Sequence, residues 1–274
     1  MRDLAIGVMT SVGGDPIEAK KWVESMGIPT MQLGCPTKEY FFATKRQELI
    51  RELNASKVRT TLVFCGYDGE DYAHAKETVG FTSPKFHRDR IKRTFEISDL
   101  TRDLKVDKIA AHVGFISDDR EDSNYGAMIE AIRDIADHCT KNGQTFVFET
   151  GQEPAHVLLQ FIIDVRRDNL GVNFDPANMI LYGSGNPIEA LETLRKYVVS
   201  VHVKDAVCPQ DGDLFKAQRR LGEVDVDIPR FINKLKGIGY KGPLTIEREA
   251  KNRRQQTKDI LDAKKLLEKL RELP

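Results

Sequence analysis

The sequence has few cysteines, no long apolar run and no excess of charge of either sign. Its four cysteines, Cys35, Cys65, Cys139 and Cys208, are scattered and form no CxxC pair, a pattern that favours reduced thiols over a disulfide framework. No apolar run approaches the roughly 20 residues that a membrane-spanning helix needs. Lys plus Arg and Asp plus Glu both total 42, so no overall field attracts nucleic acid or an anionic membrane. We therefore expect a cytoplasmic protein without a membrane or nucleic-acid partner.

What the sequence does contain is a regular alternation of two kinds of segment. Short apolar segments with the period-two pattern of strands alternate with longer amphipathic segments typical of helices. Uniform alternation favours a parallel sheet, and eight such units in about 250 residues favour a closed barrel. We expect an α/β fold, a (β/α)8 TIM barrel, in a single domain over residues 1–274, because no linker or shift in composition divides the chain. The expected strands are Leu4–Thr10, Thr30–Cys35, Arg59–Cys65, Lys108–Phe115, Thr145–Thr150, Gly171–Asp175, Val198–Ala206 and Pro243–Glu247.

Two connections carry local signals of their own. Asp15 and Pro16 are typical of an N-cap and a first helical residue, and predict a first helix that runs to about Met26. The polar stretch Gly66–Pro84 is long for a connection inside a compact domain and contains two tyrosines and a phenylalanine. Long connections of this kind are often lids or binding loops, so we expect a lid over the barrel mouth that contacts the substrate.

The last four predicted strands end in side chains that bind metal ions. The ends of adjacent parallel strands lie about 4.8 Å apart at the same edge of a barrel, so these four side chains can surround one ion. One imidazole and three carboxylates suit Mn, Mg, Co or Zn. The predicted ligands of this single divalent ion are Glu149, Asp175, His202 and Glu247. Successive side chains of a strand point to opposite faces. This alternation predicts that the four ligands point into the barrel, and that Val199 and Val201 point towards the helices. The other side chains predicted to point into the barrel are Val147, Asn173, Ser200, Lys204 and Thr245.

Glu149 and Glu247 lie at the two ends of this array and so face each other across the ion. A bound metal acts as a Lewis acid on a carbonyl and stabilises an enediolate. One glutamate can then remove the proton next to the carbonyl while the other returns it from the opposite side. This geometry suits a metal-dependent isomerase or epimerase acting on a keto-sugar, a polyol-derived ketone or a sugar phosphate.

Four motifs follow one another along the second half of the chain. They are ETGQE at Glu149–Glu153, NFDPANM at Asn173–Met179, HVKDA at His202–Ala206 and LGEVDVD…GYKGPLTIERE at Leu221–Glu249. In this order they resemble the sugar-phosphate isomerase/epimerase superfamily, the xylose-isomerase-like barrels. The resemblance implies that Glu149, Asp175, His202 and Glu247 bind a divalent metal and that the two glutamates exchange the proton.

Differences between this sequence and the family's motifs narrow the range of functions that the resemblance implies. Ketohexose 3-epimerases of the family have a histidine where this chain has Asn178 and an arginine where it has Cys208. Trinuclear apurinic-site endonucleases of the family need an Asp-x-His sequence where this chain has Lys216-Ala217-Gln218, which argues against three metals. The second glycine of the family's Gly-Glu-Gly turn is Val224 here.

Several other side chains are candidates for contacts with a small sugar or polyol-derived substrate. The candidates are His112, Lys204, Asn178, Gln152 and Glu223. His112 is equally compatible with a hydrogen-bonded core histidine, and Lys204 with an ion pair to a nearby carboxylate. Other functions remain open at this point: a dehydratase or lyase of an inosose-like or dehydro-sugar substrate, an apurinic-site endonuclease, and a non-catalytic metal-binding barrel. A homo-oligomer is also compatible with the sequence.

Overall fold

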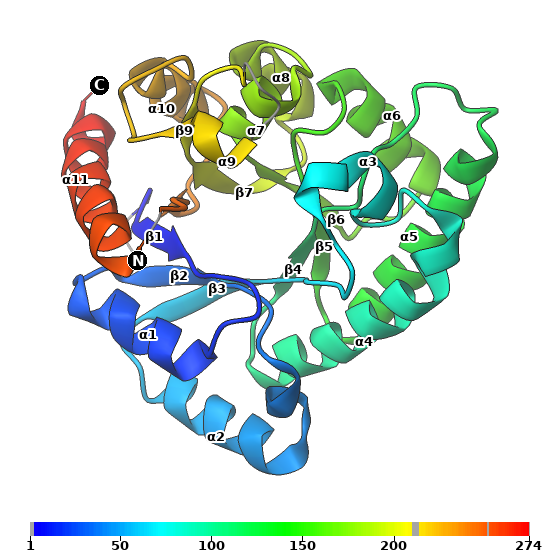
Figure 1. The fold of residues 1–274 in the computed structure, drawn as a ribbon, viewed down its shortest axis with the longest axis horizontal. Helices are drawn as coiled ribbons and strands as arrows, with labels where there is room; N and C mark the ends of the chain where they lie inside the picture. The colour runs from blue at the N-terminus through cyan, green and yellow to red at the C-terminus, as the bar shows by residue number, and fades with distance from the viewer. Residues whose placement is uncertain (1–2, 210–213, 251, 274) are drawn as a thin grey trace.

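Eight parallel strands close into a barrel in the part of the chain that the computed structural model describes, residues 3–209, 214–250 and 252–273 (Figure 1). Successive strands of the barrel pair with each other, and the last one closes the ring against the first. The predicted TIM barrel is confirmed. The barrel strands are β1 (Ile6–Met9), β2 (Thr30–Leu33), β3 (Arg59–Phe64), β4 (Lys108–Ala111), β5 (Thr145–Glu149), β6 (Leu170–Phe174), β7 (Val198–Val203) and β10 (Leu244–Ile246).

Helices surround the barrel as an outer ring (Figure 1). The C-terminal helix α11 (Arg253–Glu272) packs beside β1, so that the two ends of the chain meet on one side of the barrel. The indole Nε1–H of Trp22 donates to the hydroxyl of Thr257 at 2.9 Å, a contact that ties the first helix to the last. The other helices of the ring are α1 (Pro16–Ser25), α2 (Ala43–Asn54), α4 (His87–Asp103), α5 (Ser123–Lys141), α6 (Ala155–Val165), α8 (Pro187–Leu194) and α10 (Ile228–Gly237).

The start of α1 has the predicted cap. The Asp15 carboxylate accepts the backbone N–H groups of Ile17 and Glu18, each at 2.9 Å, and Pro16 occupies the first helical turn. These two donors have no partner inside the helix, so the carboxylate satisfies groups that would otherwise need water. The phenol of Tyr40 donates to the second carboxylate oxygen at 2.7 Å and holds the cap against the next connection.

Apolar side chains form two layers, one on each side of the barrel wall. The outer layer lies between strands and helices and includes the fully buried rings of Phe146, Phe148 and Phe174. A smaller inner cluster occupies one half of the lumen and consists of Leu62, Phe64, Ala110 and Val147. The other half of the lumen, beside β2, β6, β7 and β10, is lined with buried polar side chains that hydrogen-bond to one another.

One valine lies on the opposite face of its strand from the one that we predicted. The pairing between β6 and β7 shifts by one residue after Val172, and this bulge turns both Val199 and Ser200 towards the lumen. Val199 packs against the inner cluster, so the prediction that it faces the helices is wrong. Val201 does pack in the outer layer, and His202 keeps its predicted place inside the barrel.

Two further differences lie at strand ends near the candidate site. β4 ends at Ala111, before the predicted end at Phe115, and Gly114 has a φ of 92° that no extended strand contains. His112 therefore follows the strand directly. After β6 the chain turns at once into the short helix α7 (Pro176–Tyr182), which we did not predict. Seven residues are too few for helical periodicity to be recognised, although an aspartate followed by a proline is a helix-start signal.

The long connections contain short elements. The segment 66–84 includes the 3₁₀ turn η2 (Tyr72–His74) and the helix α3 (Ala75–Thr78), and the turn η3 (Pro84–Phe86) ends it. The connection after β2 includes η1 (Lys38–Phe41). In the connection after β7, α9 (Leu214–Ala217) precedes β9 (Gln218–Arg219), which pairs antiparallel with β8 (Asp205–Ala206). Residues 210–213 of this connection lie outside the described residues.

Within the ranges that the structure describes, no helix combines the length and the apolar character needed to cross a membrane.

Candidate metal centre

The four predicted ligands lie together at the C-terminal mouth of the barrel. Glu149 is the last residue of β5, Asp175 follows β6, His202 is near the end of β7, and Glu247 follows β10. One ligand atom from each lies within 4.8 Å of those of the other three. Side chains far apart in the sequence therefore converge because parallel strands place their carboxyl ends at one edge.

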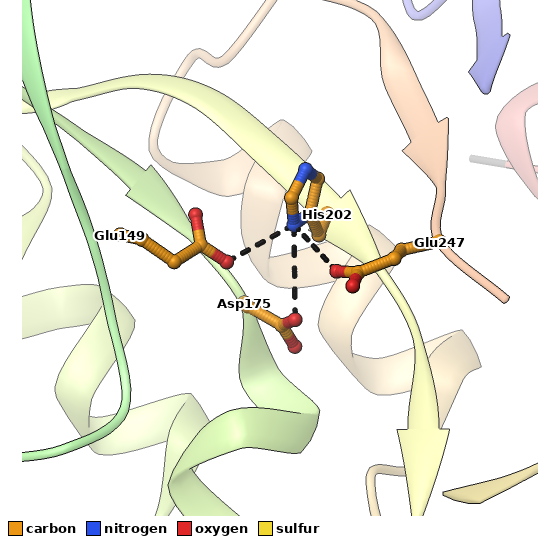
Figure 2. A group of neighbouring side chains, drawn as sticks. All are labelled: Glu149, Asp175, His202 and Glu247. Carbon is orange, nitrogen blue, oxygen red and sulfur yellow. Dashed lines mark hydrogen bonds and ion pairs between the residues drawn. The ribbon is translucent and has the colours of Figure 1, made fainter. Parts of the chain in front are cut away.

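His202 stands at the centre of the cluster. Figure 2 shows the carboxylates of Glu149 and Glu247 approaching its Nδ1 atom from opposite sides, with Asp175 between them. The distances from Nδ1 are 3.0 Å to Glu149 Oε1, 2.8 Å to Glu247 Oε2 and 3.8 Å to Asp175 Oδ2. Three carboxylate oxygens thus face one imidazole nitrogen around a common point.

Asp175 supplies an observation that fits a metal ion. Its Oδ1 atom caps α7 by accepting the backbone N–H groups of Ala177 at 2.8 Å and Asn178 at 3.2 Å. Its Oδ2 atom is completely buried and has no hydrogen-bond partner among the described residues. A buried carboxylate oxygen without a partner is costly, and a cation at the centre of the cluster would satisfy it. With ligand distances of about 2.0–2.2 Å, two ligands of one ion lie at most about 4.4 Å apart. The four ligand atoms here lie within 4.8 Å of one another, which is close to this limit.

Burial and neighbouring charges give the two opposed glutamates different pKa values. Burial raises the pKa of Glu149 to about 7, against the opposing charge of His202. Burial acts in the same direction on Glu247, but the charges of Lys204 and His202 outweigh it and hold the pKa of Glu247 well below its usual range. Without an ion, the cluster thus contains one carboxyl group that readily holds a proton and one that stays ionised.

Sequence reasoning missed Gln32, which sits beneath the cluster at the end of β2. The Nε2–H of His202 donates to Gln32 Oε1 at 2.8 Å, so that His202 Nδ1 is the nitrogen left facing the carboxylates. The amide nitrogen of Gln32 donates to Ser200 at 2.7 Å and to Asn173 at 3.1 Å, which fixes which way the amide points. A partner of this kind sets the tautomer and the orientation of a ligating imidazole. The only signal in the sequence was a glutamine inside an apolar strand.

Lys204 and Asn178 form a polar pair beside the ligands. The Lys204 ammonium donates to Asn178 Oδ1 at 3.1 Å and to Glu247 Oε1 at 3.2 Å, and lies 3.6 Å from Asp175 Oδ2. Burial alone would lower the pKa of Lys204, but the carboxylates of Glu247 and Asp175 outweigh it and raise this pKa. Both side chains are buried and both line the cavity above the cluster. A fixed ammonium group therefore faces the same space as the candidate ion.

His112 lines the same cavity and is held by Gln152. The amide Nε2 of Gln152 lies 2.8 Å from His112 Nδ1, and burial lowers the pKa of His112 to about 4, so the imidazole is neutral. With Nδ1 accepting, the Nε2–H remains available as a donor. The ring of Tyr72 meets His112 edge-on with centroids 5.6 Å apart. Gln152 itself does not line the cavity, so it would act on a substrate through the side chains that it contacts, such as His112.

Glu223 is a predicted contact residue that lies away from the cluster. Its side chain is exposed and lies 3.6 Å from Arg220. The turn around it is held by Asp205, whose carboxylate accepts the backbone N–H groups of Gly222 at 2.9 Å and Val224 at 3.3 Å. These contacts use the backbone of the turn and leave the Glu223 side chain outside the cavity wall.

A cavity of about 810 Å³ opens above the cluster. One side of its wall carries His202, Lys204 and Glu247, and the other side is formed by the connections after β1, β2 and β3. Aromatic side chains line much of it: Phe64, Tyr67, Tyr72 and Tyr182. Its volume lies within the range of about 300–1,000 Å³ that is typical of small-molecule sites.

Known proteins share this architecture. The model of the family described as xylose isomerase-like TIM barrel matches residues 21–273. A xylose isomerase domain protein from Planctomyces limnophilus is 38% identical, with 98% of each chain covered and a TM-score of 0.91. A D-tagatose 3-epimerase-like protein is 18% identical, with 99% of this chain and 97% of that chain covered and a TM-score of 0.77. A xylose isomerase-like TIM barrel protein from Mycobacterium smegmatis, solved in complex with magnesium, is 14% identical, with 99% and 97% covered and a TM-score of 0.72.

Proposed function

Because the chain belongs to the xylose isomerase-like TIM barrel family, we propose that it is a divalent-metal-dependent isomerase or epimerase of a keto-sugar. The observation that carries the proposal is the pair Glu149 and Glu247, which approach one point from opposite sides (Figure 2). A proton removed from one face of a carbon and returned to the other inverts that carbon, and this requires two groups placed in this way.

Glu149, Asp175, His202 and Glu247 would hold the ion. When bound, the ion supplies a Lewis acid that polarises the substrate carbonyl and stabilises negative charge on its oxygen. Three carboxylates and one imidazole are compatible with Mn, Mg, Co or Zn, and the ligand types do not choose among these.

Residues of the chain would transfer the proton and bind the substrate. The ammonium of Lys204 lies beside Glu247 and favours its ionised form, so Glu247 would accept the proton in one direction, and Glu149, on the opposite side of the cluster, would return it. In the reverse direction the two exchange roles. The neutral imidazole of His112 can donate its Nε2–H to a substrate oxygen, and Lys204 with Asn178 can bind a hydroxyl next to the carbonyl.

The same residues can also support a dehydratase or lyase of a dehydro-sugar. Removal of the proton next to the carbonyl is the first step of both reactions, and elimination follows if a neighbouring hydroxyl leaves. The Lys204 ammonium is the observation that favours this second candidate, because a buried cation beside the cluster can hydrogen-bond to the departing hydroxyl and stabilise the negative charge that develops on its oxygen. The fate of the hydroxyl in the product decides between the two.

The test is metal-dependent exchange of substrate hydrogen with deuterated solvent. A panel of ketohexoses, ketopentoses, inososes and sugar phosphates is incubated with metal-loaded protein in D₂O and followed by NMR. We expect at least one keto-sugar to gain deuterium next to its carbonyl. Glu149→Gln and Glu247→Gln keep one ligating oxygen but lose the base, so each should slow exchange by about 10²–10⁴.

Metal content decides whether a slow variant has lost its base or its ion. Each variant is analysed for bound metal, and only variants with wild-type content are interpreted. In an epimerisation, the two variants should differ in which substrate epimer loses its exchange. Glu223→Gln serves as the matched control, because this exposed glutamate lies outside the cavity wall. Wild-type exchange in both metal-loaded variants would remove the two glutamates from the mechanism.

A further inference from the structure

The cavity is larger than a monosaccharide requires. A water molecule occupies about 30 Å³ in the liquid, so 810 Å³ has room for roughly 27 atoms of that size. A hexose has twelve non-hydrogen atoms and would fill less than half of this space. With the sugar carbonyl at the metal centre, most of the cavity remains for another part of the substrate.

The remaining space lies on the opposite side of the mouth from the ligands. The ligands come from β5, β6, β7 and β10, which are neighbours in the barrel, whereas β1, β2 and β3 form the facing arc. The wall on that arc includes Val12, Thr37 and Tyr67. Val12 is half exposed and its side chain lies against Gly66, so it borders the cavity without being part of the core.

The cations on the cavity wall are already paired with carboxylates. In the described part of the wall, every lysine and arginine has a carboxylate partner. The pairs are Lys38 with Asp68 at 2.6 Å, Arg93 with Glu96 at 3.1 Å, Lys204 with Glu247 at 3.2 Å and Arg248 with Asp259 at 3.0 Å. An anionic group on the substrate would have to compete with a carboxylate for each of these cations, and a phosphate site instead presents cations and N–H groups that lack an anion.

Two further carboxylates of the cavity wall add negative charge to it. Glu249 accepts an amide N–H of Gln218 at 2.6 Å, and Glu70 accepts the backbone N–H groups of Gly80 at 2.9 Å and Tyr67 at 3.2 Å. Neutral hydroxyl groups can donate to such carboxylates, whereas a second anion would be repelled. Aromatic side chains such as Tyr67 and Tyr72 offer apolar faces on which a neutral ring can pack.

From size and charge together, we propose that the substrate is an uncharged keto-sugar that carries a second neutral group of ring size, such as a keto-sugar unit within a disaccharide. The second group occupies the space between the facing arc and the metal centre. The inference rests on the proposed function, because it assumes that the carbonyl of the keto-sugar unit binds at the metal centre. It ranks sugar phosphates and simple monosaccharides below such a substrate.

The test compares three forms of one keto-sugar. The ketohexose that exchanges best in the panel is offered free, as its 6-phosphate, and with a neutral glucosyl group on O6, which for fructose is isomaltulose. Deuterium exchange at the carbon next to the carbonyl is measured as kcat/KM for each form. We expect the glucosyl form to exceed the free sugar at least tenfold and the phosphate by more.

A bulky substitution on the facing arc tests the location. Val12→Trp should lower the ratio of kcat/KM for the glucosyl form to that for the free sugar at least tenfold, because the indole fills the space of the second group. Ile163→Trp is the matched control: Ile163 is also half exposed but lies on α6, outside the cavity wall, and should leave the ratio unchanged.

The outcomes separate this inference from the proposed function. A free sugar or phosphate that exchanges as well as the glucosyl form overturns the inference and leaves the keto-sugar function standing. An unchanged ratio in Val12→Trp overturns the placement of the second group. Exchange in no keto-sugar, whether free, phosphorylated or glucosylated, with metal bound, overturns both.

Discussion

At the scale of single residues, the uncharged side chain of Gln32 determines which ring nitrogen of His202 faces the proposed metal site. Gln32 accepts from His202 Nε2–H, and its own amide is held by Ser200 and Asn173. The amide cannot flip without losing these two acceptors of its N–H groups, so Nδ1 is the nitrogen that faces the carboxylates. Gln32 is thus a positioning residue that acts through His202.

Replacing Gln32 by Leu should weaken metal binding by about 10–100-fold, because the imidazole loses the acceptor that sets its tautomer and orientation. Isothermal titration with Mn²⁺ measures the affinity, and urea unfolding measures the stability. Gln144→Leu is the matched control, since Gln144 is equally buried but bonds to Ser98 on α4, away from the cluster. Equal affinities in Gln32→Leu and the wild type would contradict the positioning role.

Glu153 is a second residue whose environment makes a testable difference, here to stability. Its side chain is buried, Oε2 has no partner among the described residues, and burial raises its pKa from 4.5 to about 8. Below pH 4.5 both the folded and the unfolded state bind the proton, so the shift has no effect on stability. As the pH rises towards 8, only the unfolded state releases it, and the folded state loses relative stability.

We therefore expect Glu153→Gln to remove part of the stability loss between pH 5 and pH 8.5. The shift corresponds to at most about 5 kcal/mol, and water entering the site would reduce this. Urea midpoints of the wild type and the variant at both pH values give the comparison. The same pH dependence in both proteins would show that the Glu153 carboxyl does not titrate with a raised pKa.

At the scale of elements, the connection 66–84 has an anchored half and an exposed half. Phe81 is fully buried, and its backbone N–H donates to Val113 O at 2.7 Å. The Glu70 carboxylate binds the backbone at both ends of the connection. Tyr72, in contrast, is partly exposed, lines the cavity and touches His112. The lid function of this connection stays a prediction, and Tyr72 is the residue through which it would act.

Tyr72→Ala and Phe81→Ala should therefore have opposite effects. Tyr72→Ala removes a half-exposed ring from the cavity wall, so it should lower kcat/KM at least tenfold and change the free energy of unfolding by less than about 1 kcal/mol. Phe81→Ala leaves a cavity in the core and should cost about 3–5 kcal/mol of stability. Turnover and urea unfolding of the two variants provide the measurements. Comparable losses of both quantities in Tyr72→Ala would indicate a structural role for the exposed half as well.

At the scale of the whole molecule, the proposed ligands come from four strands that are distant in sequence, so a bound metal would stabilise the closed barrel. An ion at about 100 times its Kd adds about 2.7 kcal/mol to the stability of the state that binds it. For a domain of this size, this corresponds to a rise in Tm of about 5–10 °C.

Adding Mn²⁺ to chelator-treated protein should produce this rise, and His202→Ala should lose most of it. Differential scanning fluorimetry with a titration of the ion gives the dependence on concentration. The loss should be specific to the cluster, so His156→Ala on α6 should respond like the wild type. A rise of the same size in His202→Ala would show that the ion binds elsewhere.

The sequence by itself determined the barrel and the composition of the cluster. Both depend on local periodicities: the alternation of strand and helix patterns defines the architecture, and period-two parity turns Glu149, Asp175, His202 and Glu247 into the lumen. Because the strands are parallel, their carboxyl ends lie at the same edge of the barrel, whatever the lengths of the connections between them. Parity failed at Val199 because a bulge depends on how two strands pair, which neither strand encodes alone.

Only the tertiary structure decided which other side chains meet the cluster. Gln32 lies 170 residues from His202 in the sequence, and no pattern around either residue indicates their contact. Gln152 hydrogen-bonds to His112 and does not line the cavity, and Glu223 lies outside the cavity wall, where Asp205 binds the backbone of its turn. The pairing of charges across the cavity wall is likewise set by packing. Side-chain partners depend on distances between elements, and these exist only once the barrel has closed.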